Sequence, residues 1–237
     1  MSDCLHAGHR DRLREQYLRD GIDKLEPHKA LELLLFYAIP RRDTNEIAHR
    51  LLDRFGNLRG VFDAPLEDLC KVEGISRGAA TFLKFVPDIY RVSRCQESLR
   101  ERFDSIHKLA LRMTEYYIGV PIEVVYLVLL DNSRRIIKIE KICEGSVNTV
   151  ALDTRKIIET AIYGKAAGVV LVHNHPHGLP FPSEQDIDAT RTIATALQSV
   201  NIPFWEHILV AGDQYDVISS KAPELFSAPF GGGDFYE

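Results

Sequence analysis

The stretch GVVLVHNHPHGLPFPSEQD, from Gly168 to Asp186, joins an apolar run to a polar, proline-rich motif. The run GVVLV predicts a short buried strand. Side chains two residues apart on a strand point to the same side, so His173 and His175 can converge if the extended backbone continues to Pro176. Asp186 follows in the first turn of a predicted helix, which can fold back towards the end of the strand. The stretch therefore predicts a strand, loop and helix with a cluster of polar side chains where they meet.

Two explanations fit this cluster. Two imidazoles and one carboxylate would give zinc three protein ligands and leave a fourth position for water, as in catalytic zinc sites. We therefore predict one Zn²⁺ ion held by His173, His175 and Asp186. Alternatively, Ser183 and Asp186 form an ordinary helix N-cap pair, and the histidines end a strand and face solvent. The two explanations are compatible, because a cap would fix the helix end that carries Asp186.

The composition indicates a folded protein of the cytoplasm. The chain has 237 residues and 45% hydrophobic residues, enough for one large domain or two modest ones. The first residues lack a signal-peptide pattern, and the longest apolar runs are too short to span a bilayer. We therefore expect no membrane partner. The four scattered cysteines lack C-x-x-C spacing, so we expect reduced thiols. No basic stripe is present, so tight nonspecific binding of nucleic acid is not indicated.

Hydrophobic periodicity divides the chain into two domains and a tail. Apolar spacing, prolines and glycines predict helices up to about residue 94, followed by a polar link at 94–105. Beyond it, strands at 123–130, 136–143, 168–172 and within 205–219 alternate with helices at 105–119, 153–166 and 183–201. The predicted fold class is α/β: a helical N-terminal domain (1–103), an α/β domain with a mixed sheet flanked by helices (104–228), and a flexible tail (229–237).

The motif and its context resemble a known family. HNHPHGLPFPSEQD is similar, position by position, to the JAMM (MPN+) metal motif, and with WEHILV downstream it resembles the bacterial RadC family. The segments HRDRLREQYLRDG, ELLLFYAIPRRD and LLDRFGNL are similar to that family's N-terminal region, so the resemblance covers nearly the whole chain. It implies that His173, His175 and Asp186 bind zinc and that Ser183 stabilises a developing oxyanion.

The resemblance also implies a general base. Glu123, in GVPIEVVYLVLL, stands where the family has a glutamate that acts on the zinc-bound water. Such a water needs a proton acceptor within hydrogen-bond reach that is not itself a tight ligand. Taken alone, Glu123 would be a solvated residue at a strand entrance.

The resemblance leaves the roles of two single residues and one segment open. His177 replaces a small residue of the family, and it would be a bystander, a substrate contact or a competing ligand. The segment NTVALDTRKI lacks the His-Pro-Arg type of sequence expected before its helix, which puts substrate contacts there in doubt. His207, in WEHILV, would either form a hydrogen bond that holds a metal ligand in place or be a core histidine whose hydrogen bonds are made within the protein.

Other nucleic-acid chemistries fit the sequence less well. HNH nucleases separate their motif residues by long spacers, and zinc deaminases need H-x-E with a later P-C-x-x-C, which this chain lacks. LEDLCKVEGISRGAATFLK does resemble a helix-hairpin-helix, in which Gly74, Ile75 and Ser76 would be the candidate phosphate contacts. Ser76 replaces the second glycine of that pattern, and a Cβ restricts positive φ and close backbone approach. Packing or partner binding by a helical bundle explains the segment equally well.

The sequence therefore predicts a zinc-dependent metallohydrolase of the RadC/JAMM type that acts on an amide or isopeptide bond of a peptide or protein. One alternative is a DNA-associated metallohydrolase or repair factor that binds DNA through the N-terminal hairpin. Another alternative is a non-catalytic module with a structural zinc ion.

Overall fold

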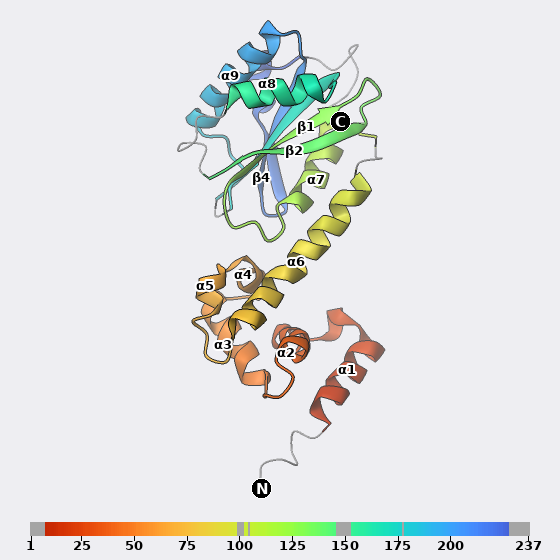
Figure 1. The fold of residues 1–237 in the computed structure, drawn as a ribbon, viewed down its shortest axis with the longest axis vertical. Coiled ribbons are helices and arrows are strands. Elements are labelled where there is room, and N and C mark those ends of the chain that lie inside the picture. The colour runs from red at the N-terminus through yellow and green to blue at the C-terminus, as the bar shows by residue number, and fades with distance from the viewer. Residues whose placement is uncertain (1–7, 99–101, 104, 146–152, 177, 228–237) are drawn as a thin grey trace. The chain divides into compact units, whose positions relative to one another are not determined.

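The computed structural model describes residues 8–98, 102, 103, 105–145, 153–176 and 178–227 (Figure 1). The predicted tail, His177 and residues 148–152 of NTVALDTRKI lie outside them. Contacts divide the chain into two compact units, Met1–Ile89 and Tyr90–Glu237. Within the described ranges, no helix is both long and apolar enough to cross a membrane.

The first unit is helical, as predicted. It contains α1 (His9–Asp20), η1 (Ile22–Lys24), α2 (Pro27–Ala38), α3 (Asn45–Phe55), α4 (Leu58–Asp63), α5 (Leu66–Leu69) and the beginning of α6 (Arg77–Ser98). Its core is made by apolar side chains such as Leu35, Leu51 and Leu83, all fully buried. Helix α6 extends to Ser98, into the segment predicted as a polar link. Polar residues such as Arg, Gln and Glu are also good helix formers, so polarity alone did not separate a linker from a solvated helix.

The second unit is built on the predicted mixed sheet. Its strands are β1 (Val124–Leu130), β2 (Ile136–Glu144), β3 (Gly168–Asn174), β4 (Phe204–Ala211) and β5 (Gln214–Val217), in the order β2-β1-β3-β4-β5. Strands β3 and β4 are parallel, and every other neighbouring pair is antiparallel. Two short 3₁₀ helices, η2 (Ile218–Ser220) and η3 (Pro223–Leu225), follow β5.

Helices cover both faces of this sheet (Figure 1). Helix α7 (Ile106–Tyr116) packs on one face, against a cluster that includes Val170 and Val172. Helices α8 (Thr154–Tyr163) and α9 (Glu184–Ser199) pack on the other, against a cluster that includes Val169 and Leu171. Because side chains alternate along a strand, the residue two positions beyond Leu171 also faces the α9 layer. That residue is His173.

A glycine sets how closely the start of β3 approaches β4. A Cβ added to Gly168 would lie 2.2 Å from Cε2 of Trp205, which is fully buried on β4. Any larger residue would have to displace the indole ring. The absence of a side chain at Gly168 therefore lets Trp205 pack against the start of β3, beside the two strands that carry the polar residues described next.

Candidate metal centre

The structure brings the three predicted metal ligands together. His173 is the second-last residue of β3, His175 follows the end of that strand, and Asp186 is in the first turn of α9. One ligand atom from each residue lies within 4.8 Å of the other two. His173 and Asp186 are buried, with 1% and 4% of their surfaces exposed, and His175 is partly buried. The group could therefore hold a metal ion at the edge of the core.

The distances fit a tetrahedral site. Nε2 of His173 lies 3.0 Å from Nε2 of His175 and 3.2 Å from Oδ1 of Asp186. Nε2 of His175 lies 3.7 Å from Oδ2 of Asp186. Two ligands of a tetrahedral zinc ion, each about 2.0–2.1 Å from the metal, lie about 3.3–3.4 Å apart. The distances from His173 to His175 and to Oδ1 of Asp186 are thus close to the spacing that a shared ion requires, and the distance from His175 to the other carboxylate oxygen is somewhat longer.

The protonation of His175 also suits a ligand. Its Nδ1 lies 3.0 Å from the carbonyl oxygen of Leu179, which can only accept a hydrogen bond. In the neutral ring Nδ1 therefore carries the proton, and Nε2 keeps its lone pair directed towards His173 and Asp186. The contact also joins the strand end to the loop before α9.

Asp186 is held as a carboxylate by its surroundings. Burial opposes its ionisation, but contacts with His173 and hydrogen bonds from Ser183 outweigh burial and hold the pKa of this carboxyl well below its ordinary value. Both the backbone N–H and the hydroxyl of Ser183 donate to Oδ2, at 2.8 and 2.6 Å. An ionised carboxylate is the form that binds a metal.

The structure confirms the capping explanation. The side chain of Ser183 accepts from the backbone N–H of Asp186 at 3.2 Å, and the two residues form a reciprocal capping box at the start of α9. The cap orients the helix end that carries the third donor. Ser183 itself is exposed, beside the group of ligands.

Glu123 lies immediately before β1, and the neighbouring backbone is anchored to β3. The side chain of Asn174 accepts from the N–H of Val124 at 2.7 Å and donates to the carbonyl of Ile122 at 3.0 Å. Val125 pairs with His173 across the antiparallel ladder, which begins two residues after Glu123. An extended backbone that continued this register would set Glu123 opposite His175, on the face of the ligand histidines, and the role of Glu123 stays a prediction. Sequence reasoning missed Asn174, whose only signal was its position between the two histidines.

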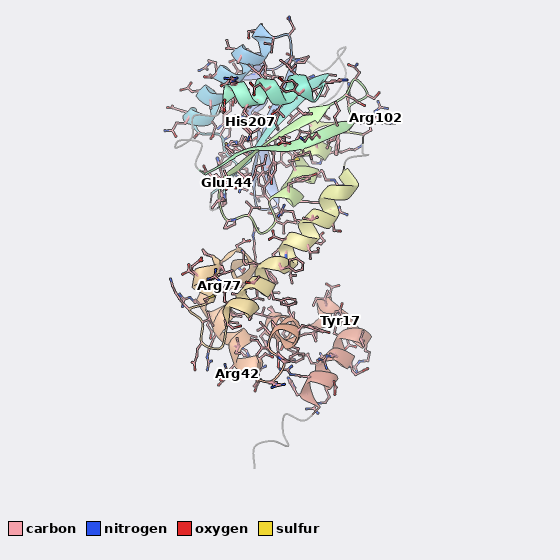
Figure 2. All side chains as sticks on the ribbon, viewed as in Figure 1. Tyr17, Arg42, Arg77, Arg102, Glu144 and His207 are labelled. Carbon is pink, nitrogen blue, oxygen red and sulfur yellow. The ribbon has the colours of Figure 1, made fainter. Side chains whose placement is uncertain are left out.

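His207 is a buried neighbour of the site. It lies on β4 in the second unit (Figure 2), 1% exposed, and burial together with nearby His173 lowers its pKa well below the ordinary value. Its Nε2 lies 2.8 Å from Nδ1 of His173, and its Nδ1 lies 2.6 Å from Oγ1 of Thr190. Thr190 is a residue that sequence reasoning did not single out. Its one available signal was its spacing, one helical turn after Asp186 on the buried side of α9.

A second buried acid lies next to His207. Burial raises the pKa of Glu206 to about 7. Its Oε1 accepts from the backbone N–H groups of His207 and Ser219, at 2.8 and 3.2 Å. Among the described residues Oε2 has no hydrogen-bond partner. Glu206 thus supports the backbone of β4 and is not one of the three converging donors.

The N-terminal turn has groups with structural roles. Gly74 adopts a positive φ of 96°, and Ile75 is buried in the helical core. The N–H of Ile75 donates to the carbonyl of Val72 at 3.0 Å, and Ser76 Oγ accepts from the N–H of Ala79 at the start of α6. Contact of this turn with nucleic acid stays a prediction.

Comparison with known proteins identifies relatives of both units. Residues 103–224 match the family model of the RadC-like JAB domain, and residues 6–81 match the UPF0758 N-terminal model. UPF0758 protein FN0909 of Fusobacterium nucleatum is 33% identical over 223 residues, which cover 91% of this chain and 96% of that protein. UPF0758 protein SPO0054 of Ruegeria pomeroyi is 34% identical over 211 residues, which cover 85% and 91%.

Proposed function

The chain belongs to the UPF0758 family and carries a RadC-like JAB domain, and from this premise we propose that it is a zinc-dependent hydrolase of amide or isopeptide bonds. The observation that carries the proposal is the convergence of His173, His175 and Asp186 at near-tetrahedral spacing. Two imidazoles and one carboxylate are a ligand set of catalytic zinc sites, whereas structural zinc sites use four protein ligands.

Each residue of the site has a role in this reaction. A zinc ion with an open coordination position polarises the substrate carbonyl and makes water nucleophilic near neutral pH. The carboxylate of Glu123 takes a proton from the attacking water and delivers it to the amine nitrogen as the carbon–nitrogen bond breaks. The single hydroxyl proton of Ser183, which is donated to Oδ2 of Asp186 in this structure, turns to the oxyanion that develops on the carbonyl oxygen, while the backbone N–H of Ser183 keeps its bond to Asp186. Burial of His173 and Asp186 excludes solvent from the ligand side of the centre.

The decisive experiment separates metal binding from turnover. Wild type and Glu123→Gln are loaded with Zn²⁺, analysed for metal content and incubated with a proteome-derived peptide library that includes lysine-branched peptides. New N-termini and newly freed lysine amines are detected by mass spectrometry. We expect one zinc ion per chain in both proteins, and cleavage by the wild type alone. Cleavage by the glutamine variant at the wild-type rate, or zinc-loaded wild type that cleaves nothing, would contradict the proposal.

The role of Ser183 needs a control for its cap. Removing an N-cap costs about 1 kcal/mol of stability, whatever the side chain does in catalysis. Asp153 caps α8 in the same unit, where its side chain accepts from the N–H of Lys156 at 3.1 Å. We expect Ser183→Ala to lose at least about tenfold in kcat, in line with the loss of one oxyanion donor. Asp153→Ala should lose similar stability and keep its activity. Equal activity losses in the two variants would reduce Ser183 to a structural residue.

A further inference from the structure

The ring of hydrogen bonds behind His173 has a direction that follows from donor and acceptor chemistry. The hydroxyl of Thr190 lies 2.5 Å from the backbone carbonyl of Asp186 and 2.6 Å from Nδ1 of His207. A carbonyl oxygen can only accept, so the single hydroxyl proton of Thr190 is donated to it. The hydroxyl oxygen must then accept from His207, which places a proton on Nδ1 of that ring.

The proton on Nδ1 of His207 determines which nitrogen of His173 is protonated. His207 is 1% exposed, and no described carboxylate forms an ion pair with it, so its ring is neutral in the folded protein. With the proton on Nδ1, its Nε2 is an acceptor. The contact of 2.8 Å to His173 therefore requires that Nδ1 of His173 carries a proton and donates it. The remaining nitrogen of His173, Nε2, faces His175 and Asp186 and is the one left to bind a metal.

We propose that Thr190 and His207 are positioning residues that fix His173 in the tautomer able to bind the metal. The arrangement ties two ligands together, because Thr190 holds the backbone of Asp186 at one end and His207 holds the ring of His173 at the other. In metal sites, the group that binds the second ring nitrogen of a histidine selects its tautomer and orientation, and losing such a group typically costs 10- to 100-fold in metal affinity. The inference rests on the metal-binding part of the proposed function and is independent of hydrolysis.

The first test needs no metal and uses a variant only to assign signals. Nitrogen NMR of the histidine rings in the metal-free protein distinguishes the two tautomers, with the signals of His173 assigned from a His173→Gln sample. We expect wild-type His173 to be protonated at Nδ1 at neutral pH. A neutral ring protonated at Nε2 alone would overturn the proposal, whether or not the protein proves to be an enzyme.

The second test measures affinity for Zn²⁺ by competition with a chromophoric chelator. Thr190→Val keeps the shape of the side chain but removes its hydroxyl, and we expect at least about tenfold weaker binding and a mixture of His173 tautomers. Thr190→Ser restores the hydroxyl and should bind within about threefold of the wild type. Thr192→Val removes the hydroxyl of an exposed threonine on the same helix, bonded to the carbonyl of Asp188 at 3.0 Å, and should leave affinity unchanged. Wild-type affinity in Thr190→Val would refute the positioning role, whereas a wild type that binds no zinc would instead refute the proposed function.

Discussion

Replacing Glu206 by glutamine should make the second unit more stable at alkaline pH and change it little at acidic pH. Burial raises the pKa of Glu206 from 4.5 to about 7, so the folded state favours the protonated acid. Below pH 4.5 both states are protonated and the carboxyl has no cost. As the pH rises from 4.5 to 7, the unfolded chain ionises first and stability falls, and above 7 the loss is complete. One pKa unit corresponds to about 1.4 kcal/mol, so the raised pKa of Glu206 lowers the free energy of unfolding at alkaline pH by about 3 kcal/mol.

Glutamine mimics the protonated acid. Its side-chain oxygen can still accept from the N–H groups of His207 and Ser219, which contact Oε1 in the wild type. The difference in free energy of unfolding between Glu206→Gln and the wild type should therefore shift by about 2.5 kcal/mol in favour of the variant from pH 5 to pH 8.

The adjacent residue provides the assay. Trp205 is the one tryptophan of the chain and is fully buried, so its fluorescence during urea unfolding reports the α/β unit alone. Glu184→Gln, at the exposed start of α9, is a matched control, and its stability difference from the wild type should change by less than 1 kcal/mol over the same range. A stability difference between Glu206→Gln and the wild type that is the same at pH 5 and pH 8 would show that folding does not raise the pKa of Glu206.

Three further predictions concern the same unit. Gly168→Ala should destabilise it by about 1–3 kcal/mol, because the new Cβ would lie 2.2 Å from the ring of Trp205; unchanged urea unfolding would contradict this. Tyr117→Phe should cost about 1 kcal/mol in the same assay, because the buried hydroxyl donates to the carbonyl of Val172 at 2.8 Å; an unaltered midpoint would mean that this bond is energetically neutral. Zn²⁺ at 100 times its Kd should stabilise the wild type by about 2.7 kcal/mol and not stabilise Asp186→Ala, and equal stabilisation of both would place the ion elsewhere.

The candidate ligands were readable from sequence because local geometry places them. His173 and His175 are two residues apart on an extended chain, and Asp186 is three residues after the cap of its own helix. Strand periodicity and capping rules act over such short distances and need no knowledge of the tertiary fold. The helical first unit and the mixed sheet were predicted for the same reason, from periodicities of 3.6 and 2.

Glu123 marks the limit of such local rules. It lies 50 residues before the first ligand histidine, and only the family resemblance drew attention to it. Whether it can approach the histidines depends on the register of β1 against β3, which pairs Val125 with His173. A shift of one residue would turn Glu123 to the opposite face of the sheet, and strand composition does not specify that register.

The residues behind His173 depend on an irregularity that sequence does not reveal. Phe204 packs in the α9 layer, so strict alternation along β4 would turn His207 towards α7 and away from His173. The register with β3 shifts between Val169 and Val170, where Phe204 is followed in the pairing by Glu206. This shift reverses the alternation and brings His207 to the face of His173. A single extra residue in β4 thus decides whether His207 can reach the metal ligand, and its effect appears only when the two strands are paired.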